Sequence, residues 1–266
     1  MATYTGIDDL TVSLEGNVLS VTLNRPDSLN SLTEEMMTAL ADALDQAATD
    51  PAVKVVRIGG AGRGFCAGAG ISAEDQAKKS ASTKTDGLLG EANRAIRAIT
   101  ALPKPVVAVV QGATAGIGVS LALACDVVIA SENAFFLLAF TKIGLMPDGG
   151  ASALVAAAIG RIRAMRMALL AERIPAADAY AFGLVSSVHP ADELDTAVDA
   201  VITTLESGPA VALRKTKHAI NEATLTELEP AIARELEGQK ILLRSKDFTE
   251  GTRAFQQRRA ASFTDE

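Results

Sequence analysis

The chain has 266 residues, of which 48% are hydrophobic and 21% are charged, with 25 basic residues against 32 acidic ones. This composition excludes a disordered chain, and the acidic balance with few aromatic residues argues against a nucleic-acid partner, which needs a basic surface or stacking platforms. The apolar stretches are too short to cross a bilayer and residues 1–10 lack a basic residue, so we expect a cytoplasmic protein with no membrane partner.

The first quarter of the chain predicts a hairpin, a helix and a strand. Apolar runs at 10–14 and 18–23 flank a Glu-Gly-Asn turn, which is typical of a β-hairpin. Ser31 and Glu34 have the spacing of a capping box and predict the start of an amphipathic helix that ends at Asp50 and Pro51. A buried strand is expected over 53–58, and it enters a glycine-rich segment over 59–70.

The middle of the chain repeats this alternation of strand, turn and helix. A polar segment that we expect to be mobile covers 72–84, and a helix follows over about 86–101. A strand over 106–110 leads into a second glycine-rich turn over 112–118, which opens a helix over 120–124 and is followed by a strand over 127–130. This pattern is typical of stacked βαβ units.

From Gly149 onward the pattern is almost wholly helical. We therefore predict a core domain over residues 1–200 and a helical C-terminal region over 201–266 that reaches a neighbouring subunit.

Motifs for nucleotides and metals are absent from the sequence. There is neither a dinucleotide-binding nor a phosphate-binding glycine fingerprint. The two histidines, His189 and His218, are far apart and have no ligand spacing, so a histidine triad or metal site is not expected. Cys66 and Cys125 are interpreted as small buried hydrophobic residues. We predict no metal and no cofactor.

The two glycine-rich turns are the remaining candidates for chemistry. Each exposes main-chain N–H groups, and glycine lets a ligand oxygen approach the backbone next to a helix N-terminus. Two N–H donors that converge on one oxygen form an oxyanion hole. The competing interpretation is that both turns are tight connections with no catalytic part.

Several ordered motifs together give a specific resemblance. They are Asn24-Arg25-Pro26, Leu29-Asn30-Ser31-Leu32, Gly64 to Ala69, Gly112 to Asp126, Ile143 to Gly150, Ala181 to Val185 and Ala254 to Arg259. In this order and at these separations they resemble the crotonase family, the enoyl-CoA hydratase/isomerase superfamily, over nearly the whole chain.

The resemblance implies an α/β protein with a crotonase-type ββα spiral core and a helical C-terminal trimerisation region. It also implies an acyl-CoA thioester as the substrate, with CoA arriving as part of that substrate, and a homo-oligomer that is a trimer or a hexamer.

The resemblance further implies where the thioester binds. The main-chain amides of Ala69 and Ile117 would donate to the thioester oxygen. The remaining substrate-binding positions would be Arg25, Ala67, Gly70, Ile71, Ser72 and Phe140. Arg25 would meet the CoA phosphates or would simply be solvated, and the sequence leaves both interpretations open.

The catalytic side chains depart from the hydratase pattern of the family. The two glutamates that activate water in hydratases would stand at Ser120 and Phe140, and neither side chain can ionise. Asp148 matches the catalytic carboxylate of one group of Δ3,Δ2-enoyl-CoA isomerases, so a 3-enoyl-CoA to 2-enoyl-CoA isomerase is the preferred prediction. The competing interpretation is that Asp148, in Pro-Asp-Gly, is only a turn residue.

Two alternatives to the isomerase prediction remain open. One is a hydratase or thioester hydrolase with atypical acids, which requires a second carboxylate folded near the thioester. The other is a non-catalytic acyl-CoA binding subunit that has kept the oxyanion turns and lost its acids.

Overall fold

The computed structural model describes residues 3–70 and 87–264. The strands are β1 (Leu10–Glu15), β2 (Val18–Leu23), β3 (Val55–Gly60), β4 (Gly64–Cys66), β5 (Val106–Val110), β6 (Ala113–Ala115), β7 (Val127–Ser131), β8 (Phe135–Leu137), β9 (Arg173–Pro175) and β10 (Ser187–His189). The helices are α1 (Glu34–Thr49), α3 (Gly87–Ala101), α4 (Ile117–Ala124), α5 (Ala151–Leu170), α6 (Ala176–Phe182), α7 (Leu194–Ser207), α8 (Ala210–Thr224), α9 (Leu228–Leu242) and α10 (Lys246–Gln256). Short 3-10 helices lie at η1 (Pro26–Ser28) and η2 (Phe140–Ile143).

These strands form two sheets. The larger sheet has the order β1-β2-β3-β5-β7-β10, and its β1-β2 pair is the antiparallel hairpin that the sequence predicts. The other neighbouring strands in it are parallel. The smaller sheet has the order β4-β6-β8-β9, in which only the β8-β9 pair is antiparallel. The predicted alternation of strands and helices is therefore confirmed.

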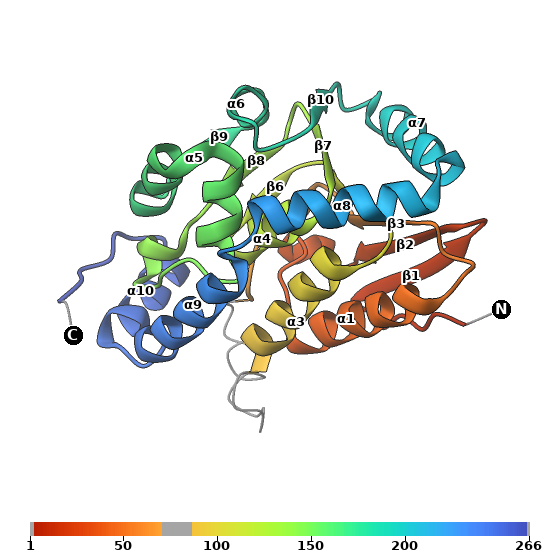
Figure 1. Ribbon diagram of the computed structural model, residues 1–266. Helices are drawn as coiled ribbons and strands as arrows, with labels where there is room; N and C mark the ends of the chain where they lie inside the picture. The colour runs from red at the N-terminus through yellow and green to blue at the C-terminus, as the bar shows by residue number, and fades with distance from the viewer. Residues whose placement is uncertain (1–2, 71–86, 265–266) are drawn as a thin grey trace.

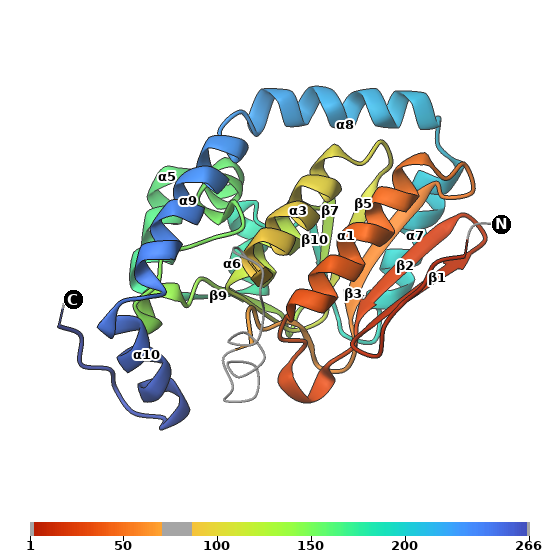
Figure 2. The ribbon, with the colours of Figure 1, turned by 90° about the horizontal axis from the view of Figure 1, so that it is seen from below.

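Helices cover both faces of the larger sheet (Figures 1 and 2). Helices α1 and α3 lie side by side on one face, and α7 packs on the other through Leu194, Val198 and Ile202. Every residue of β5, in the middle of the sheet, is buried. A strand covered on both faces has no polar side, which explains its continuous Val-rich sequence.

The start of α1 differs from the predicted capping box. The N-cap is Thr33, whose Oγ1 accepts a hydrogen bond from the Met36 N–H at 3.2 Å. Ser31 instead accepts from Arg25 and donates to Ser28 Oγ at 2.9 Å. The capping prediction was wrong because the preceding loop, rather than the helix end, uses the Ser31 hydroxyl.

Helix α4 begins earlier than predicted, at Ile117 rather than at residue 120. Gly116 is its N-cap and has a φ of +55°, a conformation that glycine adopts without strain. The early start places the Ile117 N–H at the helix N-terminus, where it has no intrahelical acceptor.

The C-terminal helices pack on the rest of the chain. Helix α9 lies against α5, and α10 lies against η2, at the end of the molecule away from β1 (Figures 1 and 2). The division into two regions stays a prediction, and residue 200 itself lies inside α7. Beyond Gly160 the side of α5 exposes Ile162, Leu169 and Leu170. The predicted homo-oligomer would have an apolar surface to bury there, and it stays a prediction.

Candidate active site

Two glycine-rich turns come together where β4 and β6 end. These strands are parallel neighbours, so the turns after them leave the same edge of the smaller sheet. A Cβ on Gly68 would lie 2.9 Å from the Ala115 oxygen and 3.5 Å from Gly116 Cα. The main chains are thus in direct contact. Because Ala69 follows the first glycine and Ile117 follows the second, the structure brings together the two amides predicted as oxyanion donors.

Among the described residues, no hydrogen bond engages the N–H groups of Ala69 and Ile117. The Leu32 N–H donates to the Gly68 oxygen at 2.8 Å and the Gly70 N–H donates to the Leu32 oxygen at 3.2 Å, so this pairing passes over Ala69. Within residues 3–70 and 87–264, neither predicted donor gives its N–H to a protein acceptor. An oxyanion hole needs two such donors, and this role of Ala69 and Ile117 stays a prediction.

Asp148 lies in the loop before α5, and this loop packs against the start of α4. A Cβ on Gly149 would lie 2.8 Å from Ile117 Cγ1. The buried Ser120 hydroxyl donates to the main-chain oxygen of Asp148 at 2.9 Å, and Gln239 Nε2 donates to its Oδ2 at 2.7 Å. The chain segment that carries the predicted acid therefore lies beside the predicted oxyanion turn and is held from both α4 and α9.

Ser120 and Phe140 occupy the positions at which the resemblance places the hydratase glutamates. The Ser120 hydroxyl is committed to the main chain of Asp148. Phe140 is 8% exposed, and its Cζ lies 3.7 Å from the position of a Cβ on Gly116. The ring therefore lies beside the oxyanion turn, where it is predicted to contact the substrate. Since neither side chain can ionise, neither can activate water.

A buried carboxylate beside the same loop was missed from the sequence. Glu235 on α9 is 1% exposed, and its Oε2 and Oε1 accept from the Gly150 N–H at 2.6 Å and the Ser152 N–H at 2.8 Å. Burial raises the pKa of Glu235, and the hydrogen bonds to Ser152 and Gly150 oppose that shift. The N-cap of α5 is a glycine without a capping side chain, so Glu235 caps this helix from another helix.

Glu235→Ala is expected to lower the free energy of unfolding by about 2 kcal/mol, because it leaves two main-chain donors without their acceptor. Glu237→Ala, on the exposed face of α9, is the matched control and should change it by less than about 0.5 kcal/mol. Urea unfolding measures both, and equal stability of the two variants would contradict the capping role.

The same carboxyl gives a pH dependence with a defined sign. Because the folded pKa of Glu235 lies above its unfolded value, the stability linked to it is present below the unfolded pKa and is lost as the pH rises through the folded one. In Glu235→Ala, the free energy of unfolding is expected to lose this decrease with rising pH, because the variant has no carboxyl group at position 235.

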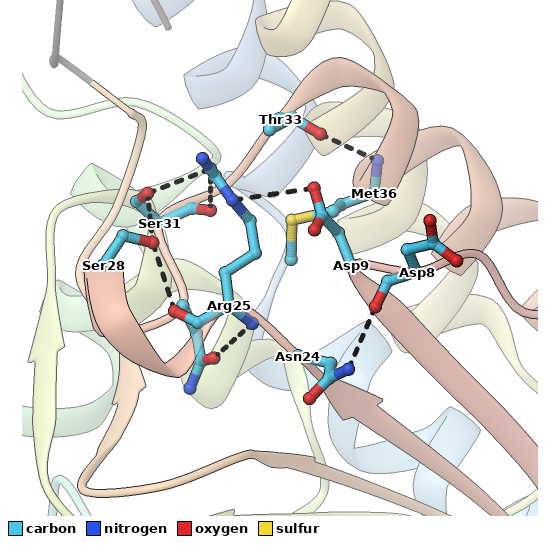
Figure 3. A network of polar contacts seen from close by, with 9 residues as sticks. Asp8, Asp9, Asn24, Arg25, Ser28, Ser31, Thr33 and Met36 are labelled. Carbon is cyan, nitrogen blue, oxygen red and sulfur yellow. Dashed lines mark hydrogen bonds and ion pairs between the residues drawn. The ribbon is translucent and has the colours of Figure 1, made fainter. Parts of the chain in front are cut away.

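Arg25 is held in a polar network formed by its own loop and by Asp9, which precedes β1 (Figure 3). Its Nη1 donates to the oxygen and the hydroxyl of Ser31 at 2.8 and 3.1 Å, its Nε lies 3.6 Å from Asp9 Oδ2, and its side chain is 16% exposed. Asn30 accepts from the Arg25 N–H at 2.9 Å and donates to the Gly64 oxygen at 2.8 Å, which ties this loop to the first glycine-rich segment. Arg25 is therefore not a solvated side chain, and its contact with CoA stays a prediction.

The other predicted binding residues follow β4. The Ala67 N–H donates to the Leu29 oxygen at 2.9 Å, and Gly70 pairs with Leu32, so both flank the predicted donor Ala69. Ile71 and Ser72 lie outside the described residues, as does the polar segment 72–84.

The histidines and cysteines lie apart from this site. His189 contacts Ser187 at 2.9 Å, and His218 is exposed beside Glu222. Both cysteines are buried, as predicted, and burial raises the pKa of Cys66 to about 12. In the described part of the chain, no three His, Cys, Asp or Glu side chains form a group that could hold a metal ion. Among the same residues, no helix has the length and apolar character that crossing a membrane requires.

Comparison with known proteins gives a consistent result. The family model "Enoyl-CoA hydratase/isomerase" matches residues 13–266. A 1,2-epoxyphenylacetyl-CoA isomerase of Escherichia coli K12 is 36% identical over 253 residues, which cover 94% of this chain and 96% of that protein. A probable enoyl-CoA hydratase of Rhodobacter capsulatus is 38% identical over 244 residues, which cover 92% of this chain and 93% of that protein.

A solved structure shows the same fold. The crystal structure of an enoyl-CoA hydratase from Mycobacterium avium subsp. paratuberculosis K-10 has 66% sequence identity and a TM-score of 0.90, and the match covers 98% of this chain and 100% of that one. This match confirms the predicted fold class. The names of the similar proteins include both an isomerase and hydratases, so the likeness alone does not select the reaction.

Proposed function

Because this chain belongs to the enoyl-CoA hydratase/isomerase family, whose members act on acyl-CoA thioesters, we propose that it isomerises a 3-enoyl-CoA to the 2-enoyl-CoA. The observation that carries this proposal is the carboxylate of Asp148, on a loop packed against Ile117. The two positions at which a hydratase would need glutamates hold Ser120 and Phe140 instead.

The proposed reaction moves one proton and one double bond. Asp148 removes a proton from C2 of the 3-enoyl thioester, and the electron pair of that C–H bond delocalises to give a dienolate. The negative charge develops on the thioester oxygen, which accepts hydrogen bonds from the N–H groups of Ala69 and Ile117. Asp148 then returns the proton to C4, which leaves the double bond between C2 and C3. No other reactant is consumed.

The oxyanion donors act on the transition state more than on the substrate. The oxygen gains charge as the C2 proton leaves, so the same two hydrogen bonds become stronger along the reaction. The position of Ile117 at the N-terminus of α4 adds the positive end of the helix dipole. No metal or additional cofactor is needed for this step.

The hydratase alternative needs a second carboxylate able to hold water. Glu235 is the acid that α9 brings to the Asp148 loop, and each of its oxygens already accepts a main-chain N–H. This arrangement supports a structural role for Glu235 and favours the isomerase. The side-chain contact between Asp148 and Gln239, 91 residues away, likewise favours a functional interpretation over a local turn residue.

The test is to incubate the pure protein separately with a 3-enoyl-CoA and with a 2-enoyl-CoA of the same chain length, and to separate the products by chromatography. The proposal predicts 2-enoyl-CoA from the first and no 3-hydroxyacyl-CoA from the second. Hydration of the 2-enoyl-CoA would reveal a water-activating acid. Tight binding without turnover of either compound, over several chain lengths, would favour a non-catalytic acyl-CoA binding subunit.

A further inference from the structure

One face of α9 carries two polar residues where an apolar stripe would be expected. The buried residues of this helix are Leu228, Ala231, Ile232, Glu235 and Gln239. Their spacing of three or four places them on one face of the helix, and the first three are apolar. Glu235 and Gln239 are each 1% exposed, and both contact the loop that carries Asp148, at Gly150 and at Asp148 itself.

The amide of Gln239 is oriented by contacts at both ends. Its Oε1 accepts a hydrogen bond from the Met146 N–H at 3.4 Å, and its Nε2 donates to Asp148 Oδ2 at 2.7 Å. A main-chain N–H can only donate, so the amide oxygen on the Met146 side gives both contacts a donor and an acceptor. The flipped amide would set two donors against each other at Met146 and two acceptors against each other at the ionised Asp148.

We propose that Gln239 is the positioning residue that orients the Asp148 carboxylate and favours its ionised, basic form. The inference rests on the proposed function of Asp148 as the acid/base. A hydrogen bond that is strongest to the ionised carboxylate favours that form before the reaction, and it also keeps the carboxyl in place for return of the proton to C4.

Close packing keeps α9 in place against this loop. A Cβ on Gly150 would lie 2.5 Å from Leu228 Cδ1, and a Cβ on Gly238 would overlap Met146 Sδ. The loop and the helix are therefore in direct contact at two glycines. The family resemblance implies that the C-terminal helical region serves in trimerisation. Through Gln239, the same region also contacts the proposed acid/base, Asp148, of its own chain.

The charged groups near the Asp148 loop also contribute to the pH dependence of activity, so a pH test must take them into account. Helix α4 has no titratable side chain, and Glu235 on α9 is engaged by main-chain N–H groups. On α3, Arg94 pairs with Asp42, Asp45 and Glu91, and Arg97 pairs with Glu229. The charged residues of η2 and of the first turn of α10 are Lys142, Lys246 and Asp247. None of these is altered by a change at position 239.

The test compares Gln239→Leu and Gln239→Glu with the matched control Glu237→Gln on the exposed face of α9. For Gln239→Leu, kcat on a 3-enoyl-CoA is expected to fall about tenfold or more with KM within about twofold, because the acid is misplaced while the substrate contacts remain. The acid limb of the kcat profile should move to higher pH by roughly one unit, since the hydrogen bond to the ionised form is lost.

Gln239→Glu distinguishes a role of residue 239 in orienting the Asp148 carboxylate from a purely structural role. Its new carboxylic acid can donate to Asp148 while it is protonated and repels it once both are ionised. We expect this variant to keep more activity than Gln239→Leu at acid pH and to lose it as the pH rises. A purely structural role would give both variants the same pH profile as the wild type, and that result would overturn the proposal.

The titration of the Asp148 carboxyl can be measured without turnover, so it tests the role of Gln239 separately from the proposed function. Carbon-13 NMR of labelled aspartate carboxyls follows the titration of Asp148. The Asp148 resonance is assigned as the one that is missing from the spectrum of Asp148→Asn. The titration midpoint should move to higher pH in Gln239→Leu and stay unchanged in Glu237→Gln. An unmoved midpoint in folded Gln239→Leu overturns the role of Gln239. Absence of isomerisation by the wild type, with the midpoint moved as expected, overturns only the proposed function.

Discussion

Asp148→Asn is expected to lower kcat for isomerisation of a 3-enoyl-CoA by about 10²–10⁴-fold, the range in which a positioned acid/base contributes. Asparagine is nearly isosteric with aspartate and keeps an oxygen that can accept the hydrogen bond from Gln239 Nε2, so the loop should hold its place. The amide cannot take up the C2 proton, and the alternative positions Ser120 and Phe140 hold no glutamate.

Binding separates this chemical defect from a folding defect. The dissociation constant for a saturated acyl-CoA, measured by calorimetry, should stay within about threefold of wild type, because Asp148 is assigned to proton transfer and not to holding CoA. Asp199→Asn, at an exposed position of α7, is the matched control and should keep full turnover. Turnover of Asp148→Asn within about threefold of wild type would remove Asp148 from the mechanism.

Gly68→Ala is expected to lower kcat by about 10²-fold through the oxyanion turns, because an error of about 1 Å in the position of catalytic donors has effects of this size. Gly68 has a φ of +90°, and its new Cβ would lie 2.9 Å from the Ala115 oxygen. The clash is with main-chain atoms, so it pushes the two turns apart. The donors on Ala69 and Ile117 would then no longer reach the same oxygen.

Gly16→Ala is the matched control for backbone strain. Gly16 has a φ of +60° in the turn between β1 and β2, and a Cβ there would approach only Glu206 Oε1, at 3.9 Å. Both substitutions strain the backbone, but only the change at Gly68 moves the turns. The ratio of kcat values in the two folded variants therefore isolates the oxyanion effect, and a ratio near one would contradict the assignment of the donors.

Much of the fold follows from local patterns in the sequence. The hairpin at β1-β2 is predicted by two apolar runs around a Gly-containing turn, and the apolar run of β5 predicts a strand. The motifs that resemble the family include the turns between such elements, as in Gly112 to Asp126, which spans β6, the Gly116 turn and α4. Each motif is contiguous in the chain, so the glycine-rich turns and Asp148 can be identified as candidates from the sequence alone.

Contacts between distant segments could not be predicted in this way. The capping prediction failed because the Ser31 hydroxyl serves Arg25 and Ser28, a choice made by the folded loop. Glu235 and Gln239 lie far along the chain from Asp148, on a helix whose sequence does not indicate its partner. The one signal in the sequence is that both polar residues occupy positions in the apolar stripe of α9, where a buried polar side chain needs a specific partner.

The most direct test of the proposed mechanism is a crystal structure of Asp148→Asn with an unreacted 3-enoyl-CoA bound. We predict that the thioester oxygen lies about 2.7–3.1 Å from both the Ala69 and Ile117 nitrogens, with C2 facing the side chain at position 148. A thioester oxygen bound away from these two amides, or a C2 atom that faces another carboxylate such as Glu235, would contradict the mechanism.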